Sequence, residues 1–176
     1  AGLVGQSLKA GVRRFVLGAP WQMALFNRPK GLDLWAGPFC NAANALCLET
    51  FKTLGMTGAF ISPELGEADI ISLCRQRPLP LGIVLSGHWP LCISRTLADG
   101  MRLREPFISP KGETAWVDQH GPDYWIFPNW KLDLTEKQKQ LVRAGIELFA
   151  HLDEPVPKAV TIKSRQGLWN WTIGLK

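Results

Sequence analysis

Three stretches of the sequence repeat one pattern, in which the end of an amphipathic helix is followed by a glycine and then by a short apolar run. The glycines are Gly11, Gly55 and Gly145, and the runs after them are nearly continuous rather than alternating. Glycine just past a helix is typical of a left-handed cap, and an unbroken apolar run is typical of a strand covered on both faces. Repeated helix-to-strand units predict a parallel α/β sheet with right-handed crossovers.

Five parallel strands are expected, near residues 12–17, 32–37, 58–62, 81–86 and 146–151. Five strands do not close a barrel, because an eight-stranded (β/α) barrel typically takes about 250 residues. The chain is therefore expected to form either an open doubly wound sheet or the later part of a barrel.

Three connecting helices are expected, over residues 41–54, 63–77 and 135–144. Asn41 is placed to cap the first helix. Pro63 and Glu64 suit the first turn of the second, because proline is tolerated there and a carboxylate is stabilised by the positive end of the helix dipole. Thr135 and Gln138 form a capping-box pattern at the start of the third.

Residues 104–130 interrupt the alternation of helices and strands. They contain turn signals at residues 110–112 and 121–123, flanked by aromatic and β-branched residues. This arrangement predicts an antiparallel hairpin inserted into the parallel fold.

The length of 176 residues fits one domain with a sizeable core. We expect this domain, with its insertion, to span residues 1–157. In the remaining tail, residues 158–176, Trp169 and Trp171 stand two apart, which suits one face of a strand and a packing role.

The composition is that of an ordinary globular protein, with 46% apolar and 20% charged residues. No apolar run approaches the roughly eighteen residues that a membrane helix needs, no signal-peptide pattern opens the chain, and the four cysteines lack zinc-like spacing. We therefore expect a reduced, cytoplasmic protein with no membrane partner and no metal. The net charge of +5 permits RNA as a partner, although the scattered lysines and arginines fit a solvated surface better.

Polar residues follow three successive predicted strands: Asn41, Glu64 and His88. Because parallel strands send their carboxyl ends to one side, we expect these residues at one rim. Glu64 suits a general base, although pairing with a helix dipole would explain it equally. His88 suits a proton carrier, although a packed rim residue is the alternative. Both are candidate catalytic residues.

Asn41 and four further residues are candidates for binding a substrate at this rim. Asn44 lies one helical turn after Asn41, where a second cap or surface role is the alternative. Arg95 could hold an anionic group by a bidentate contact. Trp35 and Trp89, near strand ends, could form an aromatic wall, with core packing as the alternative. No G-x-S-x-G, H-E-x-x-H or glycine-rich phosphate loop is present.

Several short motifs carry a resemblance to a known family. They are the N-x-x-N at Asn41 and Asn44, S-P-E-L at residues 62–65, G-H-W-P-L-C-I-S at 87–94 and W-V-D-Q-H-G at 116–121. In this order and spacing, over residues 10–155, they resemble the collagenase-like peptidases of family U-32, a (β/α)-barrel family. The resemblance implies the later part of a TIM-type barrel, whose missing strands come from a longer parent chain or from a second copy in a homo-oligomer.

The resemblance also implies a function. Some members of the family are described as peptidases or collagenases, and others take part in oxygen-independent hydroxylation of RNA or ubiquinone precursors. We therefore expect a peptidase acting on a peptide or small-molecule substrate; the alternatives are a role in such hydroxylation and a non-catalytic binding module. Several members hold an iron–sulfur cluster on four cysteines, but no cysteine follows Cys92 here, so no cofactor is expected.

Overall fold

A computed structural model describes residues 2–26, 31–110 and 112–163 of the chain. The described residues divide into two compact units. The first takes those within 2–84 and 136–150, and the second takes those within 85–135 and 151–163.

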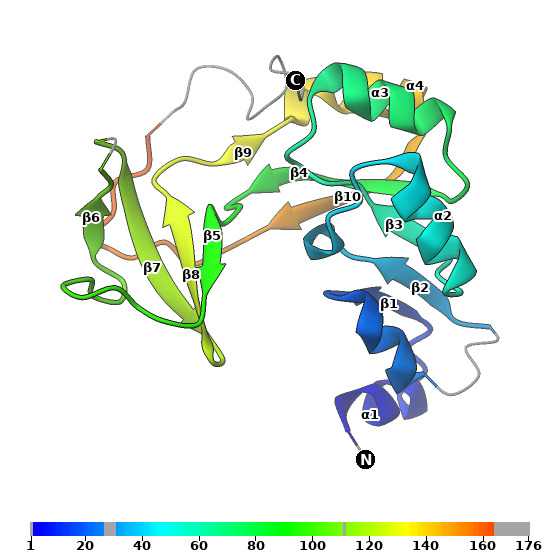
Figure 1. The fold of residues 1–176 in the computed structure, drawn as a ribbon, viewed down its shortest axis with the longest axis horizontal. Coiled ribbons are helices and arrows are strands. Elements are labelled where there is room, and N and C mark those ends of the chain that lie inside the picture. Colours follow the sequence, from blue (N-terminus) through cyan, green and yellow to red (C-terminus); the bar gives the residue numbers. More distant parts are fainter. Residues whose placement is uncertain (1, 27–30, 111, 164–176) are drawn as a thin grey trace. The chain divides into compact units, whose positions relative to one another are not determined.

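Five parallel strands form a curled half-barrel, which accounts for most of the first unit (Figure 1). In spatial order they are β1 (Arg14–Leu17), β2 (Asp33–Ala36), β3 (Gly58–Phe60), β4 (Leu81–Gly87) and β10 (Ile146–Leu152). Every strand predicted from the unbroken apolar runs is therefore confirmed to within a few residues. A short strand, β9 (Leu132–Asp133), pairs antiparallel with the last two residues of β4.

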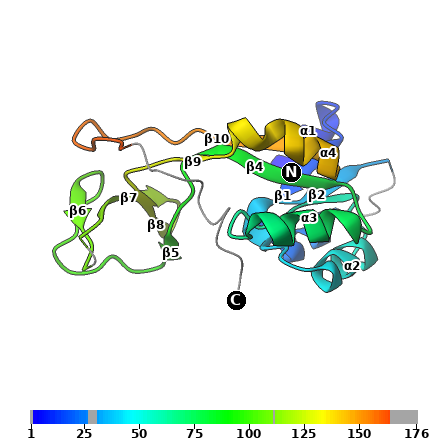
Figure 2. The ribbon, with the colours of Figure 1, turned by 90° about the horizontal axis from the view of Figure 1, so that it is seen from above.

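The connecting helices are short. The α-helices are α1 (Leu3–Lys9), α2 (Ala45–Thr53), α3 (Glu67–Arg75) and α4 (Gln138–Ala144), and the 3-10 turns are η1 (Pro20–Leu25), η2 (Pro38–Cys40) and η3 (Thr135–Lys137). Two of the helices, α2 and α4, follow a 3-10 turn. Gly11, Gly55 and Gly145 have φ angles of 89°, 91° and 108°, which confirms the predicted left-handed caps. Helices α3 and α4 lie side by side (Figure 2).

The predicted start of α2 at Asn41 is wrong. Asn41 ends the 3-10 turn η2 in a left-handed conformation with φ of 52°, and Ala42 then forms a parallel bridge with Ile61. This bridge keeps the chain extended, so that the helix begins later. Asn44 is the N-cap instead, and its Oδ1 accepts a hydrogen bond of 2.9 Å from the Cys47 amide.

The predicted starts of α3 and α4 also need correction. Pro63 and Glu64 precede α3, which Gly66 caps, because the chain turns at Ser62 before the helix begins. Thr135 lies in η3 and does not form the predicted capping box with Gln138. Its amide and hydroxyl both donate to Asp133 Oδ1, at 2.9 and 2.6 Å. In each case a local hydrogen bond holds the chain in a turn before the helix begins.

The core of the first unit forms where the apolar strands meet one face of each covering helix. Leu34 and Ala36 of β2, Leu48 of α2 and Leu81 of β4 are fully buried. Full burial of an aliphatic side chain of this size contributes about 1.5–3 kcal/mol to stability. Burial of all residues of β4 except Ser86, which is partly buried, explains why its sequence does not alternate.

The second unit is built on a four-stranded antiparallel sheet, in the order β5 (Cys92–Ser94), β8 (Asp123–Pro128), β7 (Thr114–His120) and β6 (Pro106–Ile108). Strands β7 and β8 are the predicted hairpin, and β5 and β6 extend it on either side. Trp116 and Phe127 stack at 5.3 Å between ring centroids and bury Val160 against them. The segment after β10 therefore covers one face of this sheet.

The predicted strand around Trp169 and Trp171 lies outside the described residues. No helix within the described part of the chain is long and apolar enough to cross a membrane.

Replacing Gly58 with alanine tests the packing of the parallel sheet. A Cβ at this position would stand 2.4 Å from the ring of Trp35, so Gly58→Ala should lower the free energy of unfolding by about 1–3 kcal/mol. Gly18→Ala is the matched control, because its Cβ would meet nothing closer than 3.8 Å. Chemical denaturation measures both variants, and equal stabilities would contradict this packing.

Candidate active site

The first unit holds four of the residues that the sequence marks as site candidates, and most of their side chains have structural partners. Trp35 is 5% exposed, packs edge-on against Phe60 at 5.8 Å, and donates from Nε1 to Asp33 Oδ1 at 2.8 Å. Asn44 is committed to the cap of α2, at the edge of a hollow of about 180 Å³ between α2 and α3. Asn41 and Glu64 are exposed.

The second unit holds the other three candidates. His88 is 1% exposed, directly after β4, and Trp89 is 7% exposed beside it. The Arg95 side chain is 87% exposed and forms an ion pair of 3.3 Å with Asp123 across β5 and β8. Because Glu64 and His88 belong to different units, a site that they share remains a prediction.

A serine and a histidine meet at the carboxyl ends of two neighbouring strands, within the second unit. Ser86 is the penultimate residue of β4, and His151 is the penultimate residue of β10. Ser86 Oγ and His151 Nδ1 are 2.7 Å apart. Ser86 is partly buried and His151 is exposed, so the pair can be reached from solvent.

The backbone beside this pair is held tightly. The His88 amide donates to the Leu152 carbonyl at 3.1 Å. His88 is two residues after Ser86, and Leu152 directly follows His151. Gly87 has a φ of 125°, and a Cβ built on it would lie 2.0 Å from the same carbonyl oxygen. Glycine is therefore required where the two strand ends approach most closely.

The His88 ring lies in an apolar environment. It meets Trp116 edge-on at 5.2 Å, with the ring planes at 78°. Neither ring nitrogen has a hydrogen-bond partner among the described residues. Burial lowers the pKa of His88 below its usual range, the charge of Lys131 lowers it further, and Asp153 partly opposes both effects.

The chemistry open to the Ser86 and His151 pair follows from its geometry. A hydroxyl and an imidazole nitrogen within about 2.6–3.2 Å can pass a proton directly. When the ring proton of His151 is on Nε2, Nδ1 accepts the hydrogen of Ser86 Oγ. An adjacent base of this kind activates a serine as a nucleophile toward a carbonyl carbon.

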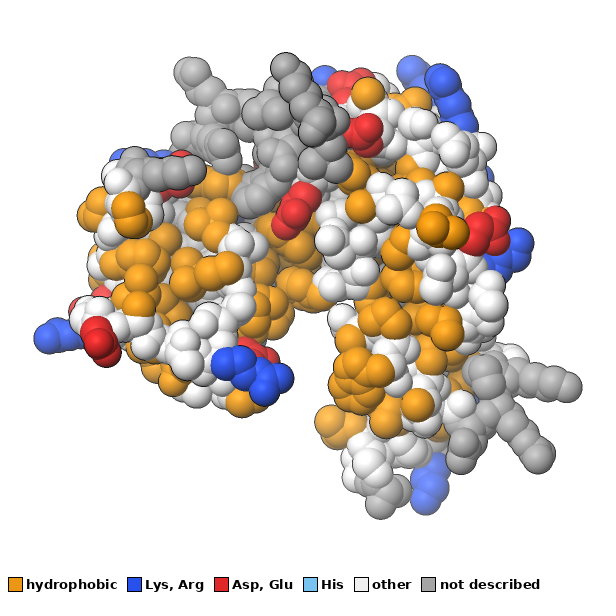
Figure 3. Space-filling view, viewed as in Figure 1, with side chains coloured by type: hydrophobic (Ala, Val, Ile, Leu, Met, Phe, Trp, Pro, Cys, Tyr) orange, Lys and Arg blue, Asp and Glu red, His pale blue; other side chains and the backbone are white. Residues whose placement is uncertain are grey.

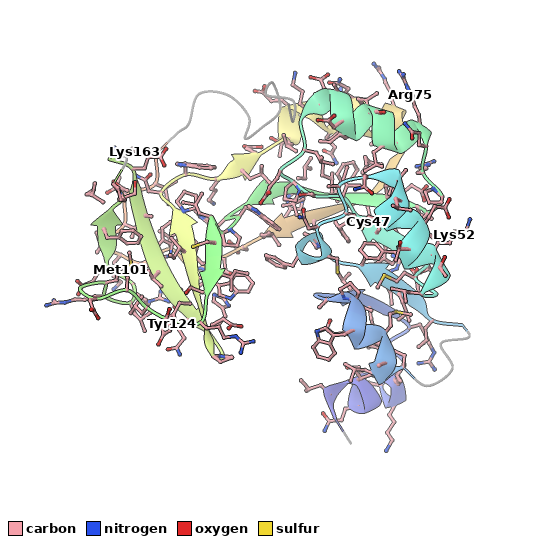
Figure 4. All side chains as sticks on the ribbon, in the orientation of Figure 1. Cys47, Lys52, Arg75, Met101, Tyr124 and Lys163 are labelled. Carbon is pink, nitrogen blue, oxygen red and sulfur yellow. The ribbon has the colours of Figure 1, made fainter. Side chains whose placement is uncertain are left out.

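The cysteines do not offer a comparable nucleophile. Burial raises the pKa of the thiols of Cys40, Cys47, Cys74 and Cys92, so that they stay protonated at neutral pH. Figure 4 places Cys47 on helix α2, where it contributes to the first unit. No group of three or more histidine, cysteine or acidic side chains within the described ranges is arranged to hold a metal ion.

Acidic and basic side chains on the antiparallel sheet are paired with one another. Asp118 contacts Arg104, and His120 Nε2 lies 3.6 Å from Glu154 while its ring stacks on Trp125 at 4.6 Å. Tyr124 lies near the turn between β7 and β8 (Figure 4). These contacts tie loops to the sheet rather than assembling a second reactive group.

Sequence reasoning looked for a site at the carboxyl ends of the parallel strands and did not name the pair of Ser86 and His151. The signal was present, because the strands predicted at residues 81–86 and 146–151 end on these two residues. Recognising the pair requires knowing that β4 and β10 are neighbours, although about sixty residues separate them along the chain.

Comparison of the chain with protein-family models, with curated proteins and with solved structures finds no match.

Proposed function

We propose that this chain is a hydrolase of the peptidase class implied by its resemblance to family U-32, acting at the carboxyl ends of β4 and β10. The observation that carries the proposal is the contact of 2.7 Å between Ser86 Oγ and His151 Nδ1. The carboxyl end of a parallel sheet is where α/β enzymes place their reacting groups. The resemblance supplies the peptide as substrate, and the serine and histidine supply the chemistry.

In the proposed reaction, Ser86 Oγ attacks the carbonyl carbon of the scissile amide and gives its proton to His151 Nδ1. The tetrahedral adduct collapses, the carbon–nitrogen bond breaks, and the leaving amine takes the proton from His151. A water molecule then attacks the ester on Ser86, with His151 accepting its proton. Release of the carboxylic acid returns the proton to Ser86 and restores both side chains.

In this proposal, Glu64 and His88 do not act together as an acid–base pair. His88 is 1% exposed, so its ring does not reach a substrate in this conformation. Glu64 belongs to the other unit, and the proposed reaction assigns it no step.

Two matched serine variants test the reaction. We expect Ser86→Ala to lower the turnover of a fluorogenic peptide or of denatured collagen by about 10³-fold or more, because no nucleophile remains. Ser94→Ala is the control, since Ser94 Oγ donates to the Thr96 carbonyl at 2.8 Å and meets no histidine. A fluorophosphonate should attach to Ser86, located by peptide mass spectrometry.

Equal turnover in Ser86→Ala and the parent chain would exclude a serine mechanism. Absence of both hydrolysis and labelling would instead favour a non-catalytic binding module.

We further propose that the half-barrel continues into a TIM-type barrel beyond β1. Strand β1 is an edge of the sheet, and α1 beside it has no buried residue. Apolar side chains gather over β1 and η1 (Figure 3); Val16, Trp21 and Leu25 are 52%, 68% and 53% exposed. Parallel sheets are normally buried on both faces and extended on open edges. Further residues of a longer chain, or a second copy, would supply the next strand.

Amide hydrogen exchange tests the open edge of β1. In a dilute solution of the 176-residue chain, the Val16 amide should exchange rapidly while the Asp33 amide, bonded to the Arg13 carbonyl at 2.8 Å, stays protected. Protection of Val16 should appear only when a partner strand is present. Equal protection of both amides in a monomer would contradict the proposed continuation.

A further inference from the structure

His88 has an environment that the proposed reaction does not itself require. It is a titratable side chain buried to 1% exposure, and neither of its ring nitrogens has a hydrogen-bond partner within the described ranges. Buried polar groups are normally satisfied, and those that are not call for an explanation. The position of His88, two residues after Ser86, suggests where that explanation lies.

The backbone of His88 ties the two reactive strands together. Its amide donates to the Leu152 carbonyl at 3.1 Å, and Leu152 directly follows His151. Gly87, between Ser86 and His88, lies against the same carbonyl. A shift of residue 88 away from β10 therefore moves Ser86 relative to His151, because only one glycine separates the two residues.

The ring of His88 is in turn fixed by the antiparallel sheet. It lies edge-on against Trp116 of β7 at 5.2 Å, and Trp116 stacks on Phe127 of β8. Neutral imidazole suits this surface better than the charged ring, because it carries no net charge and has one N–H group fewer. Imidazolium does not suit it, since both N–H groups would lack acceptors and the charge would lack water.

We infer that His88 is a positioning residue: its uncharged ring, held against Trp116, keeps Ser86 Oγ in contact with His151, and adding a proton to His88 separates the two reactive groups. The inference rests on the proposed function for its catalytic consequence. The dependence of the hydrogen bond between the His88 amide and the Leu152 carbonyl on the charge of the His88 ring is a separate claim, and it can be tested without a substrate.

The charged groups around His88 set the direction of its response to pH. Lys131, which precedes β9, opposes the protonated form, and Asp153, which follows β10, favours it; desolvation by the surrounding side chains is the largest effect and lowers the pKa. The unfolded or opened chain therefore binds this proton more readily than the closed one. Closure is stable above the ordinary histidine pKa of about 6.5 and weakens as the pH falls below it.

The rate of fluorophosphonate labelling at Ser86, measured between about pH 5 and 8, tests the catalytic consequence. In the parent chain, the proton taken up by His88 should make the labelling rate fall more steeply at lower pH than in His88→Leu, by about one unit of logarithmic slope. His88→Leu should keep the labelling rate near pH 8 within about threefold and show the shallower fall at lower pH, because leucine fills the apolar site without titrating. His120→Leu is the control, since His120 also lies against a tryptophan but contacts Glu154.

Amide hydrogen exchange of residue 88 tests the hydrogen bond between the His88 amide and the Leu152 carbonyl directly. After correction for the intrinsic effect of pH on exchange, protection of the His88 amide should fall in the parent chain as the pH drops below about 6.5, and protection in His88→Leu should stay constant. This readout needs no catalysis.

The outcomes separate the two claims. Labelling with the same steep slope in the parent chain and in His88→Leu overturns the positioning role and leaves the proposed function standing. Absence of labelling in the parent chain removes the proposed function, and the exchange of residue 88 then decides the inference alone. Protection that does not change with pH in the parent chain overturns it.

Discussion

The close approach of Gly87 to the Leu152 carbonyl is the contact on which the candidate site depends. The two chain segments meet where β4 and β10 end, and the ideal Cβ position of residue 87 is 2.0 Å from that oxygen. Any larger residue would push the strands apart and break the hydrogen bond from the His88 amide. The separation of Ser86 and His151 follows from this backbone contact, because both side chains extend from strands whose ends are locked together.

The parallel sheet could be predicted from sequence because its signals are local. Unbroken apolar runs after Gly11, Gly55 and Gly145 identify strands covered on both faces, and the structure has a strand at each place. The helix starts could not be predicted as well. The bridge between Ala42 and Ile61 depends on two segments that meet only after folding, and it moves the cap of α2 from Asn41 to Asn44.

The pair of Ser86 and His151 shows the same limit. Sequence reasoning selects polar residues that follow strands, such as Glu64 and His88, and passes over Ser86, which reads as part of an apolar run. Which side chains meet depends on strand order, and β10 lies beside β4 although the antiparallel insertion separates the two strands along the chain. The burial of His88 is equally invisible in the sequence, since Trp116 reaches it from β7.

The tautomer of His151 tests the central claim most directly. The account requires Nδ1 to be unprotonated and to accept the Ser86 hydroxyl at 2.7 Å, with the ring proton on Nε2. Nitrogen-15 NMR of the histidine rings at neutral or mildly alkaline pH distinguishes the two tautomers, and Ser86→Ala identifies the shift caused by the hydroxyl. The account predicts the Nε2–H form, with an Nδ1 resonance that moves in Ser86→Ala. A ring protonated on Nδ1 would make Ser86 the acceptor and would contradict its role as an activated nucleophile.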